Sequence, residues 1–279
     1  MEYDQQTLLH LRQVQMEILK EFIRVCEENN IRYFVMYGSA IGAERHHGYI
    51  PWDDDLDVGL LREDYEKFLQ VADQVGDAYE VITPLLCPEY SNTVTHLQKK
   101  GTLFLSEDDR DCVVKKGINI DLFVLDPVSD DESLAARQYR RSWVLGRLIF
   151  LTGKGKPHLP FGGIKAGLCR VIFKITHGLL YLFRVTPQKL YRKLEKISRR
   201  CEGQTTEYLA SFACPMAKKE SFKREWLFPL KTVPFENMSV KVPCRDDLVL
   251  TKQYGDYMQL PPVEDRVTHR PAVIDFGEE

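Results

Sequence analysis

Apolar side chains in the first part of the chain change from helical to strand spacing. From residue 5 to residue 28 they recur at the interval of one helical face, and the stretch "ENN" at residues 28–30 is expected to end that helix. These apolar positions are Leu8, Leu11, Val14, Ile18, Phe22 and Val25. The next segment, "IRYFVMYG" at residues 31–38, is short and rich in β-forming residues, which predicts a buried strand closed by Gly38.

A second strand and a second helix are predicted directly afterwards. The segment "LDVGLL" at residues 56–61 has the composition of a strand, and "REDYEKFLQVADQV" at residues 62–75 is an amphipathic helix with acidic residues in its first turn. Weaker strand patterns lie between residues 79 and 104. A stronger one, "GINIDLFVLDPV" at residues 117–128, contains a single carboxylate, Asp121, within an apolar run.

The pattern is helical and basic from about residue 131 to residue 201, and Pro157, Pro160 and Pro187 interrupt it. Short strands ("VPFENMSVKVP") and a helix ("RDDLVLTKQYGD") then precede a Pro-rich tail. We therefore expect an α+β protein with a mixed sheet. Residues 1–130 would form the core with its N-terminal helix, residues 131–205 a helical insert or subdomain, and residues 206–279 a return that completes the core.

Composition and charge exclude some classes of protein. The 279 residues are 44% hydrophobic and 28% charged, as in an ordinary globular protein. A formal net charge of -3 gives no reason to expect nucleic acid as a partner. The seven cysteines are scattered singly without a CxxC pair, which argues against a structural zinc site and favours reduced thiols in a cytosolic protein.

The chain shows neither a secretion signal nor a clear membrane span. Its N-terminal "MEYDQQTLLHLRQVQ" lacks a basic stretch followed by an apolar run. The most apolar segment, residues 164–183, is interrupted by Lys165, Arg170, Lys174 and His177, which argues against a spanning helix. We expect a cytoplasmic protein that meets a membrane, if at all, peripherally and at its inner face.

The densest candidate chemistry lies in "YGSAIGAERHHGYIPWDDDLDVGL", residues 37–60. A strand that runs through Gly38 and Ser39 into a helix presents backbone N–H groups to a phosphate, although many strand–helix joins share this feature. Asp55 and Asp57 flank Leu56, so on a strand both carboxylates leave the same face. Such a pair suits a hard divalent cation, Mg²⁺ or Mn²⁺.

A third carboxylate, Asp121, would join this pair if its strand lies beside residues 56–61. A Gly-Ser turn, a D-x-D strand and a later strand with a lone acid resemble the signature of the nucleotidyltransferase (polymerase-β-like) fold. Cations held by such acids can stabilise the attacking and leaving oxygens of an in-line displacement at phosphorus. Asp53 and its neighbour Asp54 precede the strand. They can be substrate contacts or residues of a solvated turn, and the sequence favours neither interpretation.

Three ordered blocks resemble the LicD family. They are "IRYFVMYGSAIGAERHHGYIPWDDDLDVGLLREDY", "NIDLFVLDPV" and "YGDYMQLPPVEDRVTHR", and the helical middle matches least securely. The resemblance implies transfer of phosphocholine or a similar phospho-alcohol from CDP-choline or another CDP-alcohol to a cell-surface glycan, such as a teichoic acid or lipopolysaccharide precursor, with release of CMP. Ser39 stands where Thr is common in the family, and Glu44 where Val is frequent; neither change removes a carboxylate.

In this interpretation the three aspartates and the Gly-Ser turn have separate roles. Asp55 and Asp57 hold the metal, Asp121 completes the metal site and helps to deprotonate the acceptor hydroxyl, and Gly38 and Ser39 seat the donor phosphates. Two enzyme classes and one binding class remain open: this phosphotransfer, nucleotidyl transfer to a sugar phosphate or protein, and a non-catalytic glycan- or nucleotide-binding module. Three converging acids favour an enzyme.

Further substrate contacts are predicted around this block and in the tail. Arg45 suits the donor pyrophosphate because a guanidinium binds phosphate in a bidentate manner. Trp52 could stack on a base or on a choline ammonium, or anchor its loop by packing. Arg62 could contact substrate or pair with the acidic cluster. Arg266 and His269 could reach the site, as the family match implies, or belong to a solvated terminus.

The basic helical stretch, residues 165–200, also has two interpretations. It can be a packed helical subdomain, or a surface that meets anionic lipid and so brings the enzyme to an acceptor built on a lipid carrier. The basic residues concerned are Arg170, Lys174, Arg184, Lys189, Arg192 and Lys193.

Overall fold

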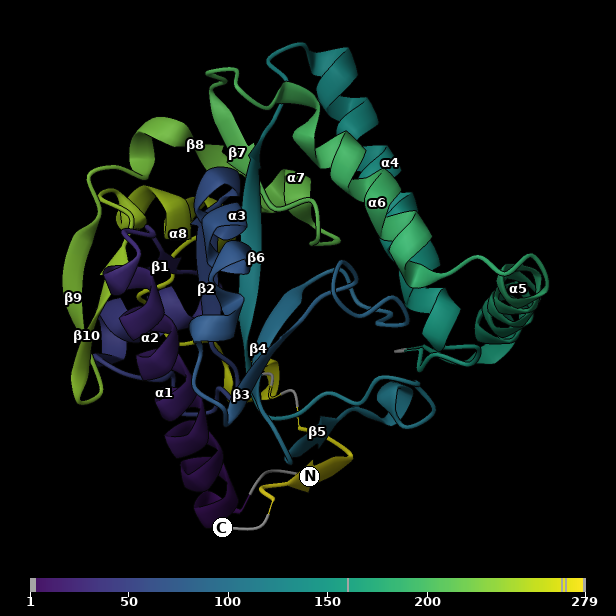
Figure 1. Ribbon diagram of the computed structural model, residues 1–279, viewed down its shortest axis with the longest axis horizontal. Coiled ribbons are helices and arrows are strands. Elements are labelled where there is room, and N and C mark those ends of the chain that lie inside the picture. The colour runs from purple at the N-terminus through teal and green to yellow at the C-terminus, as the bar shows by residue number, and fades with distance from the viewer. Residues whose placement is uncertain (1–3, 160, 267, 269, 278–279) are drawn as a thin grey trace.

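The first helix of the chain is the one that the apolar spacing predicts. The computed structural model describes residues 4–159, 161–266, 268 and 270–277 (Figure 1). Helix α1 runs over Gln5–Glu28, so the predicted bounds are confirmed. The Asp4 side chain caps it by accepting a hydrogen bond from the Thr7 amide at 2.9 Å, and Asn29 ends it by donating to the Val25 carbonyl.

A mixed sheet forms the centre of the molecule. Its strand order is β1-β2-β6-β4-β3, in which β2 and β6 are parallel and the other neighbouring pairs are antiparallel. The strands are β1 (Phe34–Val35), β2 (Asp57–Leu61), β3 (Tyr79–Ile82), β4 (Thr95–Lys99) and β6 (Asn119–Pro127). The far end of β6 pairs with β7 (Tyr208–Ala210), which pairs with β8 (Phe222–Lys223). The predicted α+β class with a mixed sheet is confirmed.

Smaller elements surround this sheet. Two separate antiparallel pairs join β9 (Lys231–Phe235) to β10 (Met238–Val242), and β5 (Leu103–Leu105) to β11 (Val273–Asp275). The helices of this part are α2 (Tyr37–His46), α3 (Arg62–Gln70), α7 (Ala217–Glu220) and α8 (Asp246–Tyr254). Short 3₁₀ turns cover Ala72–Gln74, Glu107–Asp109, Arg199–Cys201, Arg224–Trp226 and Val263–Asp265.

Two predicted strands are shorter than their apolar patterns. The strand expected over residues 31–38 is reduced to Phe34–Val35, and Tyr37 and Gly38 already belong to α2. The strand ends there because Tyr37 has a φ of 48°, a left-handed conformation that is incompatible with an extended chain. The second strand begins at Asp57, so Asp55 lies on the loop before β2 and not on the strand itself.

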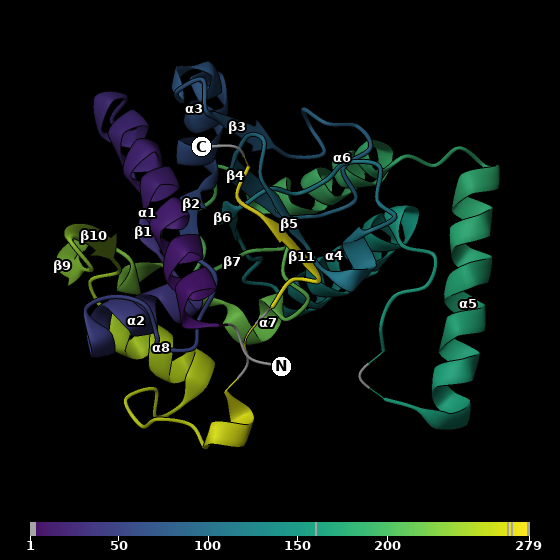
Figure 2. The ribbon, with the colours of Figure 1, turned by 90° about the horizontal axis from the view of Figure 1, so that it is seen from below.

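The basic middle of the chain forms three helices, as its pattern predicts. They are α4 (Glu132–Gly153), α5 (Gly163–Leu182) and α6 (Pro187–Ser198). Helices α4 and α6 pack on each other around Ile149, Tyr191 and Leu194, whereas α5 stands at the edge of the molecule beyond them (Figures 1 and 2). Among the described residues no single helix is long and apolar enough to cross a membrane, although α5 and the α6 segment, bent by 101°, meet the criteria as a broken pair.

A buried ionic cluster connects the sheet to α6. Arg62, at the start of α3, donates two hydrogen bonds to the Asp126 carboxylate of β6, at 2.9 and 2.6 Å, and one to Glu195 of α6 at 3.0 Å. Only 7% of Arg62 is exposed. Burial raises the pKa of Glu195, although the charge of Arg62 opposes this effect. Arg62 therefore connects three elements at the end of the sheet remote from Asp57.

Candidate active site

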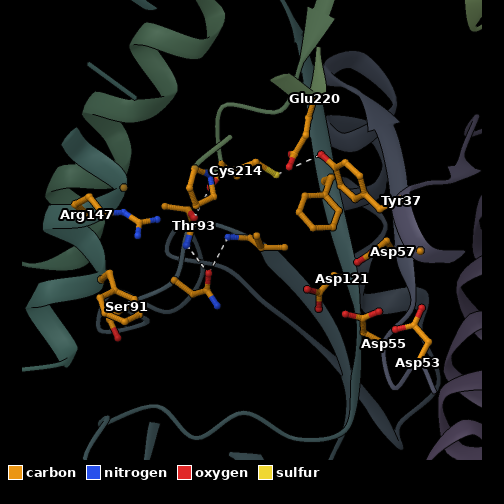
Figure 3. A pocket seen from close by; sticks show the side chains of 18 of the residues that line it. Tyr37, Asp53, Asp55, Asp57, Ser91, Thr93, Asp121, Arg147, Cys214 and Glu220 are labelled. Carbon is orange, nitrogen blue, oxygen red and sulfur yellow. Dashed lines mark hydrogen bonds between the residues drawn. The ribbon is translucent and has the colours of Figure 1, made fainter. Parts of the chain in front are cut away.

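Four aspartates open onto one cavity of about 460 Å³ (Figure 3). Asp53, Asp55, Asp57 and Asp121 line one side of it. Arg147 of α4 lies on the opposite side. The rest of the lining comes from Tyr37, Gly38, Ser91–Val94, Phe123, Gly146, Phe150, the 213–215 turn, Glu220 and Tyr254. The cavity therefore lies between the sheet and the helical middle of the chain.

Pairing of β2 with β6 brings the predicted acids together. Asp57 and Asp121 are direct partners in the parallel register, so their side chains leave the same face of two adjacent strands. The chain on either side is held by backbone bonds from the Asp121 amide to the Leu56 carbonyl at 2.8 Å and from the Met36 amide to the Asp57 carbonyl at 2.9 Å. The expectation that the strand of Asp121 lies beside that of Asp57 is confirmed.

Helix α1 fixes the loop that carries Asp53 and Asp54. Arg12 donates hydrogen bonds to the carbonyls of Ile50 and Asp53, and its guanidinium lies over the Tyr49 ring. Gln15, which is 3% exposed, donates to the Asp54 carbonyl at 2.9 Å and accepts from the Tyr49 hydroxyl at 3.2 Å. The acidic loop is thus held to α1 through its backbone carbonyls, and Asp53 and Asp55 of this loop line the cavity.

A side chain at position 38 would displace the Asp53 carboxylate from its present position. A Cβ atom on Gly38 would lie 2.6 Å from Oδ2 of Asp53, closer than any normal contact. Gly38 lines the cavity, as expected for a phosphate-binding turn, while Ser39 is buried and its Oγ accepts a hydrogen bond from the Asp57 amide at 2.9 Å. The structure therefore gives Ser39 a role in holding Asp57.

Behind Asp121 lies a chain of buried polar groups. His96 of β4 is the antiparallel register partner of Asp121, and its Nε2 is 3.1 Å from Oδ1 of Asp121. The other ring nitrogen of His96 contacts the Tyr90 hydroxyl, and Asn119 donates to the same Oδ1 at 2.6 Å. Burial by itself raises the pKa of Asp121, but the charges of His96 and Lys116 and the hydrogen bonds of His96 and Asn119 together keep that pKa below its usual value. Asp121 is thereby oriented and favoured in its ionised form.

The cavity has the donor chemistry of a hard cation site, without a closed cage of protein ligands. Among the side chains that the structure describes, no three His, Cys, Asp or Glu groups lie in an arrangement that would by itself hold a metal ion. Mg²⁺ commonly uses one or two carboxylates together with water and substrate phosphates, and it prefers oxygen ligands. Asp55, Asp57 and Asp121 fit that requirement by type and by their shared cavity.

Several of the predicted substrate contacts do not line the cavity. Arg45 is not in the cavity lining; it donates to the carbonyls of Tyr257 and Gln259 and so holds the chain after α8. Trp52 and Arg266 pair with each other, with the guanidinium 4.4 Å from the ring centroid. His269 lies outside the described residues.

Several cavity residues were not identified from the sequence. Arg147 is one of many basic residues in its helix, and no pattern distinguishes it from the others. Tyr37, expected to be a packing residue, packs edge-on against Phe123 and its hydroxyl lies 3.3 Å from Sγ of Cys214. Burial raises the pKa of both Tyr37 and Cys214. Contacts of this kind join segments almost 180 residues apart, which no local spacing reveals.

Comparison with known proteins shows where the similarity lies. Residues 30–131 match the family model described as LicD/FKTN/FKRP, nucleotidyltransferase domain. The chain is 26% identical over 272 residues to the lipopolysaccharide cholinephosphotransferase LicD of Haemophilus influenzae, covering 94% of this chain and 96% of that protein. It is 42% identical over 48 residues to the ribitol 5-phosphate transferase FKRP of human, which covers 17% of this chain and 10% of that relative. An uncharacterised Rickettsia typhi protein is 41% identical over 58 residues.

The role of α1 in holding the acidic loop can be tested by stability measurements. Gln15→Leu leaves the buried Asp54 carbonyl and Tyr49 hydroxyl without their partner, which should lower the free energy of unfolding by about 1–3 kcal/mol. Gln13→Leu, the same change on the exposed side of the same helix, should stay within about 0.5 kcal/mol of the wild type. Denaturant unfolding of both variants measures the difference, and equal values would show that Gln15 does not hold the loop.

Proposed function

We propose that the protein transfers phosphocholine, or a similar phospho-alcohol, from a CDP-linked donor to a cell-surface glycan, because residues 30–131 match the LicD family model and the whole chain is similar to a cholinephosphotransferase. The full-length similarity to a cholinephosphotransferase supports transferase activity. The observation that carries the proposal is the cavity in which four aspartates face one guanidinium, because such a site can bind a phosphate with its counter-ion.

The proposed reaction is an in-line displacement at the phosphorus that carries the alcohol. The acceptor hydroxyl oxygen forms the new P–O bond while the bond to the bridging pyrophosphate oxygen breaks, and CMP leaves with that oxygen. The hydroxyl proton passes to a carboxylate, for which we propose Asp121. His96 and Asn119 both contact Oδ1 of Asp121, and this orients the carboxylate before substrate arrives.

We propose that Asp55, Asp57 and Asp121 hold Mg²⁺, which Mn²⁺ could replace. The cation would neutralise charge on the donor phosphates. The protein's own contribution is to set the carboxylates in place: β2–β6 pairing sets Asp57 beside Asp121, and the loop held by α1 brings Asp55 to the same cavity. The overall nucleotidyltransferase topology is part of the same proposal.

On the other side of the cavity we propose that Arg147 binds donor phosphate. A guanidinium offers paired N–H donors to two phosphate oxygens. Burial lowers the pKa of Arg147, but an arginine starts from such a high value that it stays positively charged. Phe150 lies in the same lining and offers an apolar surface to the base or the alcohol.

We propose that the acceptor is a lipid-linked glycan precursor at the cytoplasmic face of a membrane. All seven cysteines are free thiols in the structure, which agrees with a reducing compartment. Nucleotidyl transfer to a sugar phosphate is the second candidate function, favoured by the description of the family model as a nucleotidyltransferase domain.

A donor panel separates these two functions. With Mg²⁺ present, incubation with CDP-choline, CDP-ribitol and CTP should release CMP from a CDP-alcohol, with CDP-choline the fastest. Asp57→Asn should reduce CMP release by orders of magnitude, while Asp73→Asn, an exposed aspartate outside the cavity, should leave it unchanged. Pyrophosphate release from CTP, with every CDP-alcohol untouched, would instead establish nucleotidyl transfer.

Metal binding has a readout that does not depend on turnover. Adding Mg²⁺ or Mn²⁺ should raise the melting temperature of the wild type, because a ligand at about one hundred times its Kd stabilises the folded state by about 2.7 kcal/mol. Asp121→Ala should lose most of this shift, and Asp73→Ala should keep it. A full metal-induced shift in the Asp121→Ala variant would remove Asp121 from the proposed metal site.

The role of Arg147 predicts a specific kinetic change. Arg147→Met should raise KM for the CDP donor by about tenfold or more, since hydrogen bonds to a charged group are worth about 1.5–3 kcal/mol. Arg141→Met, an exposed position on the same helix that does not line the cavity, serves as the matched control. If both variants have the KM of the wild type, Arg147 does not contact the donor.

A further inference from the structure

Helix α5 presents an apolar stripe to the outside of the molecule. Six residues at the spacing of one helical face are about half exposed or more: Leu168, Val171, Ile172, Ile175, Leu179 and Leu182. Leu168 is 62% exposed, Ile175 57% and Leu182 70%. A continuous stripe of this size is unusual on a free protein surface and indicates a surface that binds something.

The opposite side of α5 faces the protein. Ala166 is fully buried, Leu180 packs against the cluster formed by α4 and α6, and the His177 ring bonds to the Leu151 carbonyl at the end of α4. In Figure 2 the helix stands at the rim of the molecule, with its long axis along that edge. The stripe therefore lies on the solvent side of α5 and does not belong to the hydrophobic core.

The charges around the stripe have one sign. From residue 163 to residue 194 the chain contains no Asp or Glu, whereas the protein as a whole has a net charge of -3. Lys165 and Lys174 are exposed on α5 to the two sides of the stripe, and Arg184 follows the helix. Long basic side chains beside an apolar face can reach phosphate groups while the apolar residues enter the acyl region.

We propose that α5 is an in-plane docking helix for an anionic lipid bilayer. The stripe would lie at the boundary between headgroups and acyl chains, and its cations would contact the acidic headgroups. A second copy of the chain is the less suitable occupant, because two such helices would bring their uncompensated cations together. The benefit of such docking rests on the proposed function, in which the acceptor is carried by a lipid. Because α5 contacts α4 and α4 carries Arg147, a docked α5 would hold the cavity near that acceptor.

Vesicle co-sedimentation of the full chain tests this surface. We expect the wild type to bind vesicles of phosphatidylcholine with phosphatidylglycerol, to bind pure phosphatidylcholine vesicles at least about tenfold more weakly, and to dissociate as salt is raised. The double variant Leu168→Glu/Ile175→Glu should lose binding to the anionic vesicles by more than about tenfold, since two charges enter the apolar stripe. Leu9→Glu, an equally exposed apolar position on α1, should bind like the wild type.

Other outcomes would overturn the proposal. Binding to anionic vesicles that the double variant retains, or a wild type that binds neither kind of vesicle, would show that α5 is not the docking surface. Self-association of the wild type that the double variant abolishes would assign the stripe to a second copy. CMP release without vesicles should be the same in wild type and double variant, so a failed donor panel and a failed docking surface are distinguishable.

Discussion

The site depends on one constraint, the parallel pairing of β2 and β6 that sets Asp57 directly beside Asp121. Two carboxylates on adjacent strands raise each other's electrostatic energy, so the surrounding structure has to hold them in place. Ser39 holds the backbone amide of Asp57, and His96 and Asn119 hold the carboxylate of Asp121. The sheet register and these hydrogen bonds therefore act together: they hold the carboxylates in position before a ligand binds.

The part of the structure that could be predicted from the sequence is the part set by local pattern. The bounds of α1 follow from its apolar spacing. The two apolar runs that each carry a carboxylate are also recognisable as strands, but from the sequence their pairing is only a condition of the three-acid site, and the structure confirms it. The short β1 could not be predicted in this way. Its residues have strand propensity, but the left-handed backbone of Tyr37 is held by contacts with Phe123 and Cys214.

The positions of three arginines relative to the cavity were not predictable for a related reason. Arg45 has the chemistry of a phosphate ligand, yet its guanidinium is used by carbonyls after α8, and Arg62 is buried with Asp126. Arg147 has no local signal that separates it from its basic neighbours, and only the packing of α4 brings it opposite the acids. A residue type gives the chemistry that a side chain can perform, whereas the tertiary fold decides where that chemistry is available.

Helix α4 connects the cavity to the outer helix α5. One end of the cavity is lined by Arg147 and Phe150, and the carbonyl of Leu151 on the same helix accepts the hydrogen bond of His177 from α5. Helix α4 therefore carries both the cation side of the cavity and the contact with α5, while the acidic side of the cavity belongs to the sheet and the loop before it. The position of α4 in turn depends on α6, its packing partner, which the buried Arg62–Asp126–Glu195 cluster connects to β6 of the sheet.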